Sequence, residues 1–178
     1  MSIPNIITLG RILLVPIIVW AIASSQMEIA FVVFVIAGVS DAVDGFLAKR
    51  FNMTSELGAL LDPLADKAMI VSLYVALGII DAMPRWLVIL VVSRDIMIVG
   101  AVILAWLVDK PMKLRPLTVS KLNTVAQIVY ATFVLATLTF GWDIPWLLNS
   151  LVALVAALTL LSIAFYVAEW VRHMNATG

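Results

Sequence analysis

Six long apolar stretches follow one another along the chain with only short breaks between them. They cover 6–24, 28–48, 57–80, 84–108, 118–140 and 146–170. A helix needs about 20 mostly apolar residues to cross the hydrocarbon core of a bilayer. Of the 178 residues, 64% are hydrophobic and 12% charged, against roughly 45–50% and 25% in a soluble domain. The sequence therefore predicts an all-α integral membrane protein with six transmembrane helices.

The breaks between the stretches carry turn residues and polar side chains. They are Ser24-Ser25-Gln26, Arg50-Phe51-Asn52, Asp81-Ala82-Met83-Pro84, Asp109-Lys110-Pro111 and Gly141-Trp142-Asp143-Ile144-Pro145. No linker and no shift in composition divides the chain. Residues 1–178 are therefore predicted to form a single domain.

A polar stripe precedes the first stretch. Asn5, Thr8 and Arg11 recur at three-residue spacing and share one side of a helix. This pattern predicts a short interfacial helix that leads into the first span, and a capped N-terminus with a snorkelling arginine is the simpler alternative. Ala21-Ile22-Ala23 resembles a signal-peptide cleavage site, but the apolar stretch is long for a signal peptide, which favours a span.

Six spans place both termini on the same side of the membrane, and the basic residues then sort by side. Arg94 lies within a span and Arg85 near the opposite surface. The side of the termini holds Arg11, Lys49, Arg50, Lys67, Lys110, Lys113, Arg115, Lys121 and Arg172. By the positive-inside rule, both termini are cytoplasmic. The zero net charge argues against a nucleic-acid partner.

Four aspartates, Asp41, Asp44, Asp62 and Asp66, lie in or beside the second and third stretches. An ionised carboxylate near the bilayer centre costs about 2.5–3.5 kcal/mol. The first two are three residues apart and the last two are four apart, so each pair shares one helix face. The short connection should bring both pairs to a similar depth on the cytoplasmic side. Since the chain has no cysteine and the aspartates have no neighbouring histidine, these oxygen ligands favour Mg²⁺, Mn²⁺ or Ca²⁺.

Small and basic residues accompany the aspartates. Gly45 and Gly58 let a ligand approach the backbone closely, Ala48 extends the smooth strip beside Asp44, and Lys49 supplies a cation at its edge. Such a strip beside metal-binding carboxylates indicates a site for a diphosphate with a bulky head group. Intramembrane aspartates also occur in transporters, so a cation transporter is the alternative from another class.

The segment from Asp41 to Asp66 resembles the signature of the CDP-alcohol phosphatidyltransferases, Asp-x2-Asp-Gly-x2-Ala-Arg-x8-Gly-x3-Asp-x3-Asp. Lys49 stands where the family usually has an arginine; lysine keeps the charge but loses the planar two-pronged donor. Pro4 to Arg11 is similar to the family's entry helix, whose polar residues would face the nucleotide or order the site. The resemblance implies six transmembrane helices, a homodimer and two divalent cations, Mg²⁺ or Mn²⁺.

The resemblance also implies a reaction and roles for individual residues. An alcohol would attack the β-phosphorus of CDP-diacylglycerol and release CMP, and Asp66 would be the catalytic base. The metal ligands would be Asp41, Asp44, Asp62 and Asp66. The residues around the CDP group would be Asn5, Thr8, Arg11, Asp41, Asp44, Gly45, Ala48, Lys49, Gly58 and Asp62.

The residues that select the acceptor alcohol are expected outside this signature. Arg94 lies inside the fourth stretch and needs a polar partner. Adjacent helical residues diverge by about 100°, so Asp95 alone should not satisfy it, and Arg94 is predicted to point toward a carboxylate or a substrate phosphate. Arg115 and Lys121 belong to a basic segment that either attracts anionic lipids or binds a phosphate-bearing, lipid acceptor.

Two further segments resemble one branch of the family, the CMP-forming cardiolipin synthases. They are Ser93 to Ile98 and Leu114 to Thr124. That branch joins CDP-diacylglycerol to phosphatidylglycerol, which implies cardiolipin as the product. The sister branch uses glycerol 3-phosphate and makes phosphatidylglycerophosphate, which is the alternative. The implied location is a bacterial inner membrane, with the active site on its cytoplasmic side, and the mitochondrial inner membrane is the second possibility.

Overall fold

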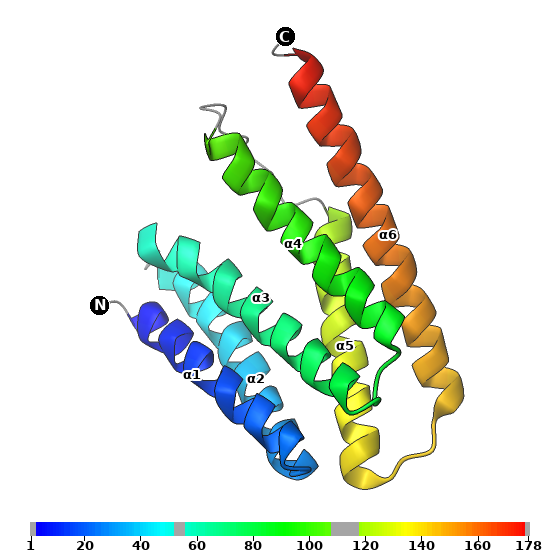
Figure 1. Ribbon diagram of the computed structural model, residues 1–178. Coiled ribbons are helices and arrows are strands. Elements are labelled where there is room, and N and C mark those ends of the chain that lie inside the picture. Colours follow the sequence, from blue (N-terminus) through cyan, green and yellow to red (C-terminus); the bar gives the residue numbers. More distant parts are fainter. Residues whose placement is uncertain (1–2, 52–55, 108–117, 177–178) are drawn as a thin grey trace. The chain divides into compact units, whose positions relative to one another are not determined.

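The computed structural model describes residues 3–51, 56–107 and 118–176, and the side chains of 9–41, 43, 65–100 and 118–172. Within these ranges all regular secondary structure is helical (Figure 1). The helices are α1 (Ile3–Ala23), α2 (Met27–Phe51), α3 (Glu56–Ile79), α4 (Arg85–Leu107), α5 (Thr118–Phe140) and α6 (Pro145–Ala176). The predicted stretches match these bounds closely, except that α6 continues to Ala176 instead of ending at 170.

Three turns between helices each contain one residue in the left-handed conformation. Ser25, Asp81 and Gly141 have φ angles of 59°, 57° and 68°. After α1, the Gln26 N–H donates to the Ala21 carbonyl at 2.8 Å, which satisfies an acceptor that the helix end leaves open. The turns fall at the polar breaks predicted from the sequence.

Helix α1 is continuous from Ile3 to Ala23. Asn5 and Thr8 therefore belong to its first turns and do not form a separate interfacial helix. Pro4 does not interrupt it, because a proline in the first turn of a helix leaves no internal hydrogen bond unmade. The depth of these turns relative to the membrane surface stays a prediction.

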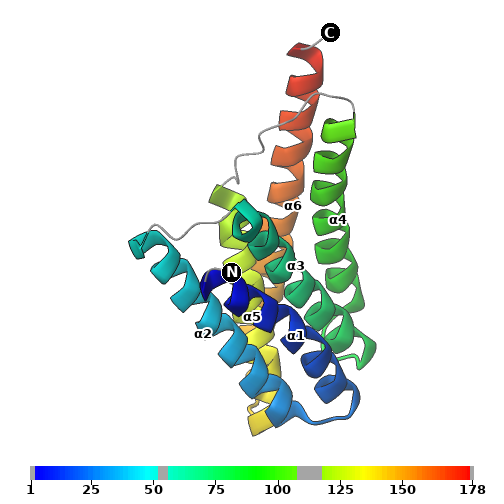
Figure 2. The same cartoon turned by 90° about the vertical axis from the view of Figure 1, so that its left-hand side faces the viewer.

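The helices form two compact units. The first unit comprises Met1–Met83 and Ala131–Asp143, and the second comprises Pro84–Tyr130 and Ile144–Gly178. In the first unit, α1 packs against both α2 and α3 (Figures 1 and 2). In the second unit, α4 and α6 lie side by side.

The exterior of these helices is strongly apolar, while polar side chains lie inside. Leu13, Ile79 and Trp146 are 69%, 73% and 71% exposed. Among the described side chains, the buried polar ones are Arg11, Arg94, Asp95, Asn123, Gln127, Thr159 and Ser162. Soluble proteins rarely leave large apolar patches facing water, and charged residues of membrane proteins face the interior. This distribution indicates a protein surrounded by lipid.

Two helices are long and apolar enough to cross a membrane, by length and composition. They are Thr118–Phe140 and Pro145–Arg172, and Leu9–Ala23 forms a shorter apolar segment. This finding covers only the described part of the chain. Together with the apolar exterior, the two helices indicate membrane association.

Candidate active site

Arg11 lies in the interior of the first unit with 1% of its side chain exposed. Its guanidinium contacts carboxylates on two other helices. Nη2 lies 2.7 Å from Oδ1 of Asp41 on α2, and Nη1 donates to Oδ1 of Asp66 on α3. The side chains of Asp41 and Asp66 are 46% and 37% exposed. One arginine therefore links three helices, while part of each carboxylate stays open to a ligand.

The guanidinium of Arg11 has donors that its protein contacts do not use fully. The contact with Asp41 is an ion pair, because Nη2 has no partner in hydrogen-bond geometry among the described residues. Nε also has no partner in that part of the chain. A buried N–H without an acceptor costs about 1–3 kcal/mol. The site therefore favours a further acceptor beside Arg11.

The structure brings together two of the four predicted metal ligands. Asp41 and Asp66 meet at Arg11, which was itself predicted to contact the CDP group. Among the side chains that are described, no three acidic, histidine or cysteine residues form a metal-binding group. The side chains of the other predicted residues of this site lie outside the described part: Asn5, Thr8, Asp44, Gly45, Ala48, Lys49, Gly58 and Asp62.

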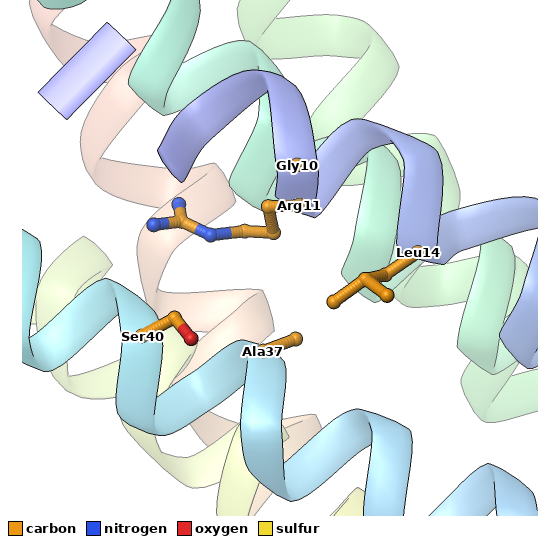
Figure 3. A pocket seen from close by; sticks show the side chains of 5 residues that line it. All are labelled: Gly10, Arg11, Leu14, Ala37 and Ser40. Carbon is orange, nitrogen blue, oxygen red and sulfur yellow. The ribbon is translucent and has the colours of Figure 1, made fainter. Parts of the chain in front are cut away.

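A pocket of about 290 Å³ lies between α1 and α2 beside Arg11 (Figure 3). Gly10, Arg11 and Leu14 line it from α1, and Ala37 and Ser40 line it from α2. In Figure 3, Arg11 and Ser40 lie toward one end, while Leu14 and Ala37 face each other at the other end. No pattern in the sequence predicts this pocket, because it depends on how the two helices are rotated against each other.

A second buried polar cluster surrounds Arg94 of α4 in the other unit. Nη1 donates to Asp95 Oδ1 at 2.5 Å, while Nε and Nη2 donate to Ser162 Oγ on α6 at 3.2 and 2.8 Å. Nη2 also donates to Ser120 Oγ at the start of α5. The ring of Tyr166 lies 5.8 Å from the guanidinium carbon. Protein groups therefore engage all three nitrogens of Arg94.

The predicted acceptor residues differ in their surroundings. Arg94 pairs with the carboxylate of the adjacent Asp95, and the serines take its other donors, while a contact with the site or with a substrate phosphate stays a prediction. The long side chain of Arg94 allows the pair with Asp95 although neighbouring residues diverge on a helix. Lys121 follows Ser120 on α5 and is exposed. Arg115 lies outside the described residues.

Polar residues of α6 contribute to this cluster, although no motif singled them out. Thr159, Ser162 and Tyr166 recur at three- and four-residue spacing in the apolar middle part of the helix, so they share one face. The Thr159 hydroxyl donates to Oδ1 of Asn123 at 3.1 Å, with both residues buried. Their periodicity was the signal that could have found them.

Replacing Ser162 by alanine is expected to lower the free energy of unfolding by about 1–3 kcal/mol, because Nε of buried Arg94 loses its acceptor and Nη2 keeps only Ser120. Denaturant unfolding of the purified protein in detergent measures this change. Ser150→Ala is the matched control. Ser150 is an exposed residue of the same helix that donates to its own helix at the Trp146 carbonyl, so a change below about 0.5 kcal/mol is expected. Equal losses in both variants would contradict the role of Ser162.

Comparison with known proteins identifies the class to which this fold and site belong. The family model for CDP-alcohol phosphatidyltransferase matches residues 1–170. The chain therefore belongs to the CDP-alcohol phosphatidyltransferase family, which confirms the resemblance seen in the sequence.

Individual relatives carry two different names. The chain is 35% identical to "Cardiolipin synthase (CMP-forming)" of Homo sapiens over 157 residues, which cover 79% of this chain and 52% of the human protein. The protein of that name from Rattus norvegicus is 34% identical, with the same coverage of both chains. "CDP-diacylglycerol--glycerol-3-phosphate 3-phosphatidyltransferase 1, chloroplastic" of Oryza sativa subsp. japonica is 33% identical over 160 residues, 80% of this chain and 49% of the rice protein. The chain spans about half the length of these relatives.

Proposed function

We propose that this chain transfers a phosphatidyl group from CDP-diacylglycerol to an alcohol and releases CMP. The observation that carries the proposal is the meeting of Asp41 and Asp66 at Arg11. Asp41 on α2 and Asp66 on α3 are the first and last aspartates of the family signature, and Arg11 contacts both of them. The family match over residues 1–170 supports the same reaction.

Residues 1–178 are proposed to form one membrane domain with six transmembrane helices and both termini in the cytoplasm. The apolar exterior of the helices and the position of the basic residues in the sequence support this topology. The proposed location is a bacterial inner membrane, with the site on its cytoplasmic side. A homodimer is proposed from family membership alone.

Two divalent cations, Mg²⁺ or Mn²⁺, are proposed as cofactors. The donor set fits them, because Asp41 and Asp66 already present carboxylate oxygens to one shared cation, the guanidinium of Arg11, and such metals take oxygen ligands. Asp44 and Asp62 would complete the set. Bound metal would neutralise charge on the diphosphate during the transfer.

Asp66 is proposed to take the proton from the acceptor hydroxyl. A general base must lie within hydrogen-bond reach of that hydroxyl, and the carboxylate of Asp66 is partly open while Arg11 holds one of its oxygens. The hydroxyl oxygen attacks the β-phosphorus, and CMP leaves with the electron pair of the broken P–O bond. The absence of cysteine favours this direct attack over a covalent intermediate on the protein.

Phosphatidylglycerol is the proposed acceptor, giving cardiolipin, and glycerol 3-phosphate is the alternative. The human relative, 35% identical, is named a cardiolipin synthase. The rice relative, 33% identical, is named a CDP-diacylglycerol--glycerol-3-phosphate 3-phosphatidyltransferase. Arg94, Arg115 and Lys121 are proposed as the acceptor-side residues. Lys121 and Arg115 would contact the acceptor phosphate, and Arg94 would act by holding Ser120, the neighbour of Lys121.

A panel of acceptors tests the proposed function. Purified protein with CDP-diacylglycerol and Mn²⁺ is offered phosphatidylglycerol, glycerol 3-phosphate, inositol phosphate or serine, and the products are separated by mass. We expect cardiolipin from phosphatidylglycerol, with CMP release that EDTA stops. Phosphatidylglycerophosphate as the sole product would establish the alternative acceptor. Cation binding without CMP release would favour a transporter.

A further inference from the structure

The pocket between α1 and α2 plays no part in the chemistry proposed so far. Its polar and its apolar lining residues lie toward opposite ends. Arg11 and Ser40 lie toward one end of the pocket (Figure 3). Leu14 and Ala37 each lie three residues away from these on their helices, roughly 4.5 Å further along at 1.5 Å per residue. Asp41 belongs to the end that holds Arg11, because it pairs with Arg11 and follows Ser40 on α2. The pocket is therefore polar toward the aspartates and apolar away from them.

Arg11 gives the polar end an N–H donor for which the described residues supply no acceptor. Its Nε is buried and has no hydrogen-bond partner among the described residues, whereas Nη1 holds Asp66. The Ser40 hydroxyl donates to the Ile36 carbonyl at 2.7 Å, so its proton is not directed at the pocket. An acceptor oxygen placed beside Nε would satisfy the buried donor.

The size and lining of the pocket limit what it can hold. Its volume of about 290 Å³ is just below the range of about 300–1,000 Å³ for sites that enclose a small ligand, so a segment of a larger molecule fits it. The end away from Arg11 is lined by the apolar side chains of Leu14 and Ala37. An apolar chain suits this end better than a charged nucleotide does, because a charged group would lose its hydration there.

We propose that the pocket binds the ester carbonyl and the first methylene groups of one acyl chain of the lipid donor. The Nε–H of Arg11 donates to the ester carbonyl oxygen, and Leu14 and Ala37 contact the methylene groups. This assignment rests on the proposed function, because it takes CDP-diacylglycerol as the donor. Arg11 then positions both sides of the reaction: its Nη atoms hold Asp41 and Asp66, and its Nε orients the lipid.

Two substitutions fill the pocket, Gly10→Leu and Ala37→Leu. A Cβ atom at Gly10 would meet no atom within 4 Å, so there is space for a side chain. Gly38→Leu is the matched control. Gly38 follows Ala37 on α2 and also has open space at its Cβ position, but it is exposed and does not line the pocket. Gly10→Ala adds a single methyl group and keeps the test usable if a leucine variant does not fold.

Native mass spectrometry of the detergent-solubilised protein measures how much CDP-diacylglycerol it retains. The affinity for the lipid is expected to fall at least about tenfold in Gly10→Leu and Ala37→Leu, the factor that corresponds to about two displaced methylene groups. A smaller loss is expected in Gly10→Ala, and Gly38→Leu should match the wild type. The affinity for CMP, measured by equilibrium dialysis, should stay unchanged in all four variants.

Two outcomes would overturn the assignment. Equal lipid retention by the pocket variants and Gly38→Leu would show that no acyl chain lies there. A parallel loss of CMP affinity in folded pocket variants would assign the pocket to the nucleotide. Failure of the proposed function is distinct, since the wild-type protein would then release no CMP with any acceptor, while lipid retention would still report on the pocket.

Discussion

Asp66→Asn is expected to lower CMP release from CDP-diacylglycerol by about 10²–10⁴-fold, the range that a positioned general base contributes. The amide has nearly the shape of the carboxylate but cannot take the proton of the acceptor hydroxyl. Its oxygen can still accept the hydrogen bond from Arg11 Nη1, so the arrangement of α1 and α3 should persist. Turnover with saturating acceptor and Mn²⁺ measures the loss, and native mass spectrometry should show that the donor lipid still binds.

Asp81→Asn is the matched control for this change. Asp81 lies in the exposed turn after α3 with a φ of 57°, a conformation that asparagine tolerates well. The same loss of charge there should leave CMP release close to the wild-type rate. Near-normal turnover in Asp66→Asn would remove Asp66 from the base role, and a loss of both turnover and lipid binding would make it a binding residue.

Arg11→Met is expected to destabilise the protein, because Asp41 and Asp66 lose the cation that they share. Removing one partner of a buried ion pair costs about 3–5 kcal/mol, and the 46% and 37% exposure of the carboxylates reduces this to an expected loss of about 2–3 kcal/mol. For a chain of this length, the unfolding midpoint Tm should fall by about 4–12 °C. Thermal unfolding in detergent with EDTA measures the shift.

Arg172→Met serves as the control for Arg11→Met, since Arg172 is an exposed arginine near the end of α6. Its Tm should stay near that of the wild type. Added Mn²⁺ should raise the Tm of Arg11→Met more than that of the wild type, because a bound cation can replace the lost charge between the carboxylates. Equal midpoints for the two variants in EDTA would argue against a stabilising role for Arg11.

The helices could be predicted from the sequence because local residues set their ends. Ser25 and Gly141 adopt the left-handed conformation where the polar breaks were identified. Helix α6 begins at Pro145, whose fixed φ suits the first helical position. Signals of this kind act within a few residues of a helix end and do not depend on how the helices pack.

The partners of the buried charges could not be predicted in the same way. Residue spacing shows which side chains share a face of one helix, but not how that helix is rotated against its neighbours. The family resemblance gave Arg11 a role beside the CDP group or in ordering the site, and its particular contacts with Asp41 and Asp66 appear only in the structure. Likewise, Ser162 reaches Arg94 from a different helix.

The partners of Arg11 are also made in a fixed order during synthesis of the chain. The ribosome completes α1 before Asp66 exists, and at about 5–20 residues per second the 55 residues that separate Asp66 from Arg11 take roughly 3–11 s to make. Until Asp41 is made, 30 residues after Arg11 (41 − 11 = 30), α1 carries an arginine with neither of its two partners. An unneutralised arginine costs about 2.5–3.5 kcal/mol at the centre of a membrane helix. Helix α1 therefore gains the partners of its buried arginine only from α2 and α3, which are translated after it.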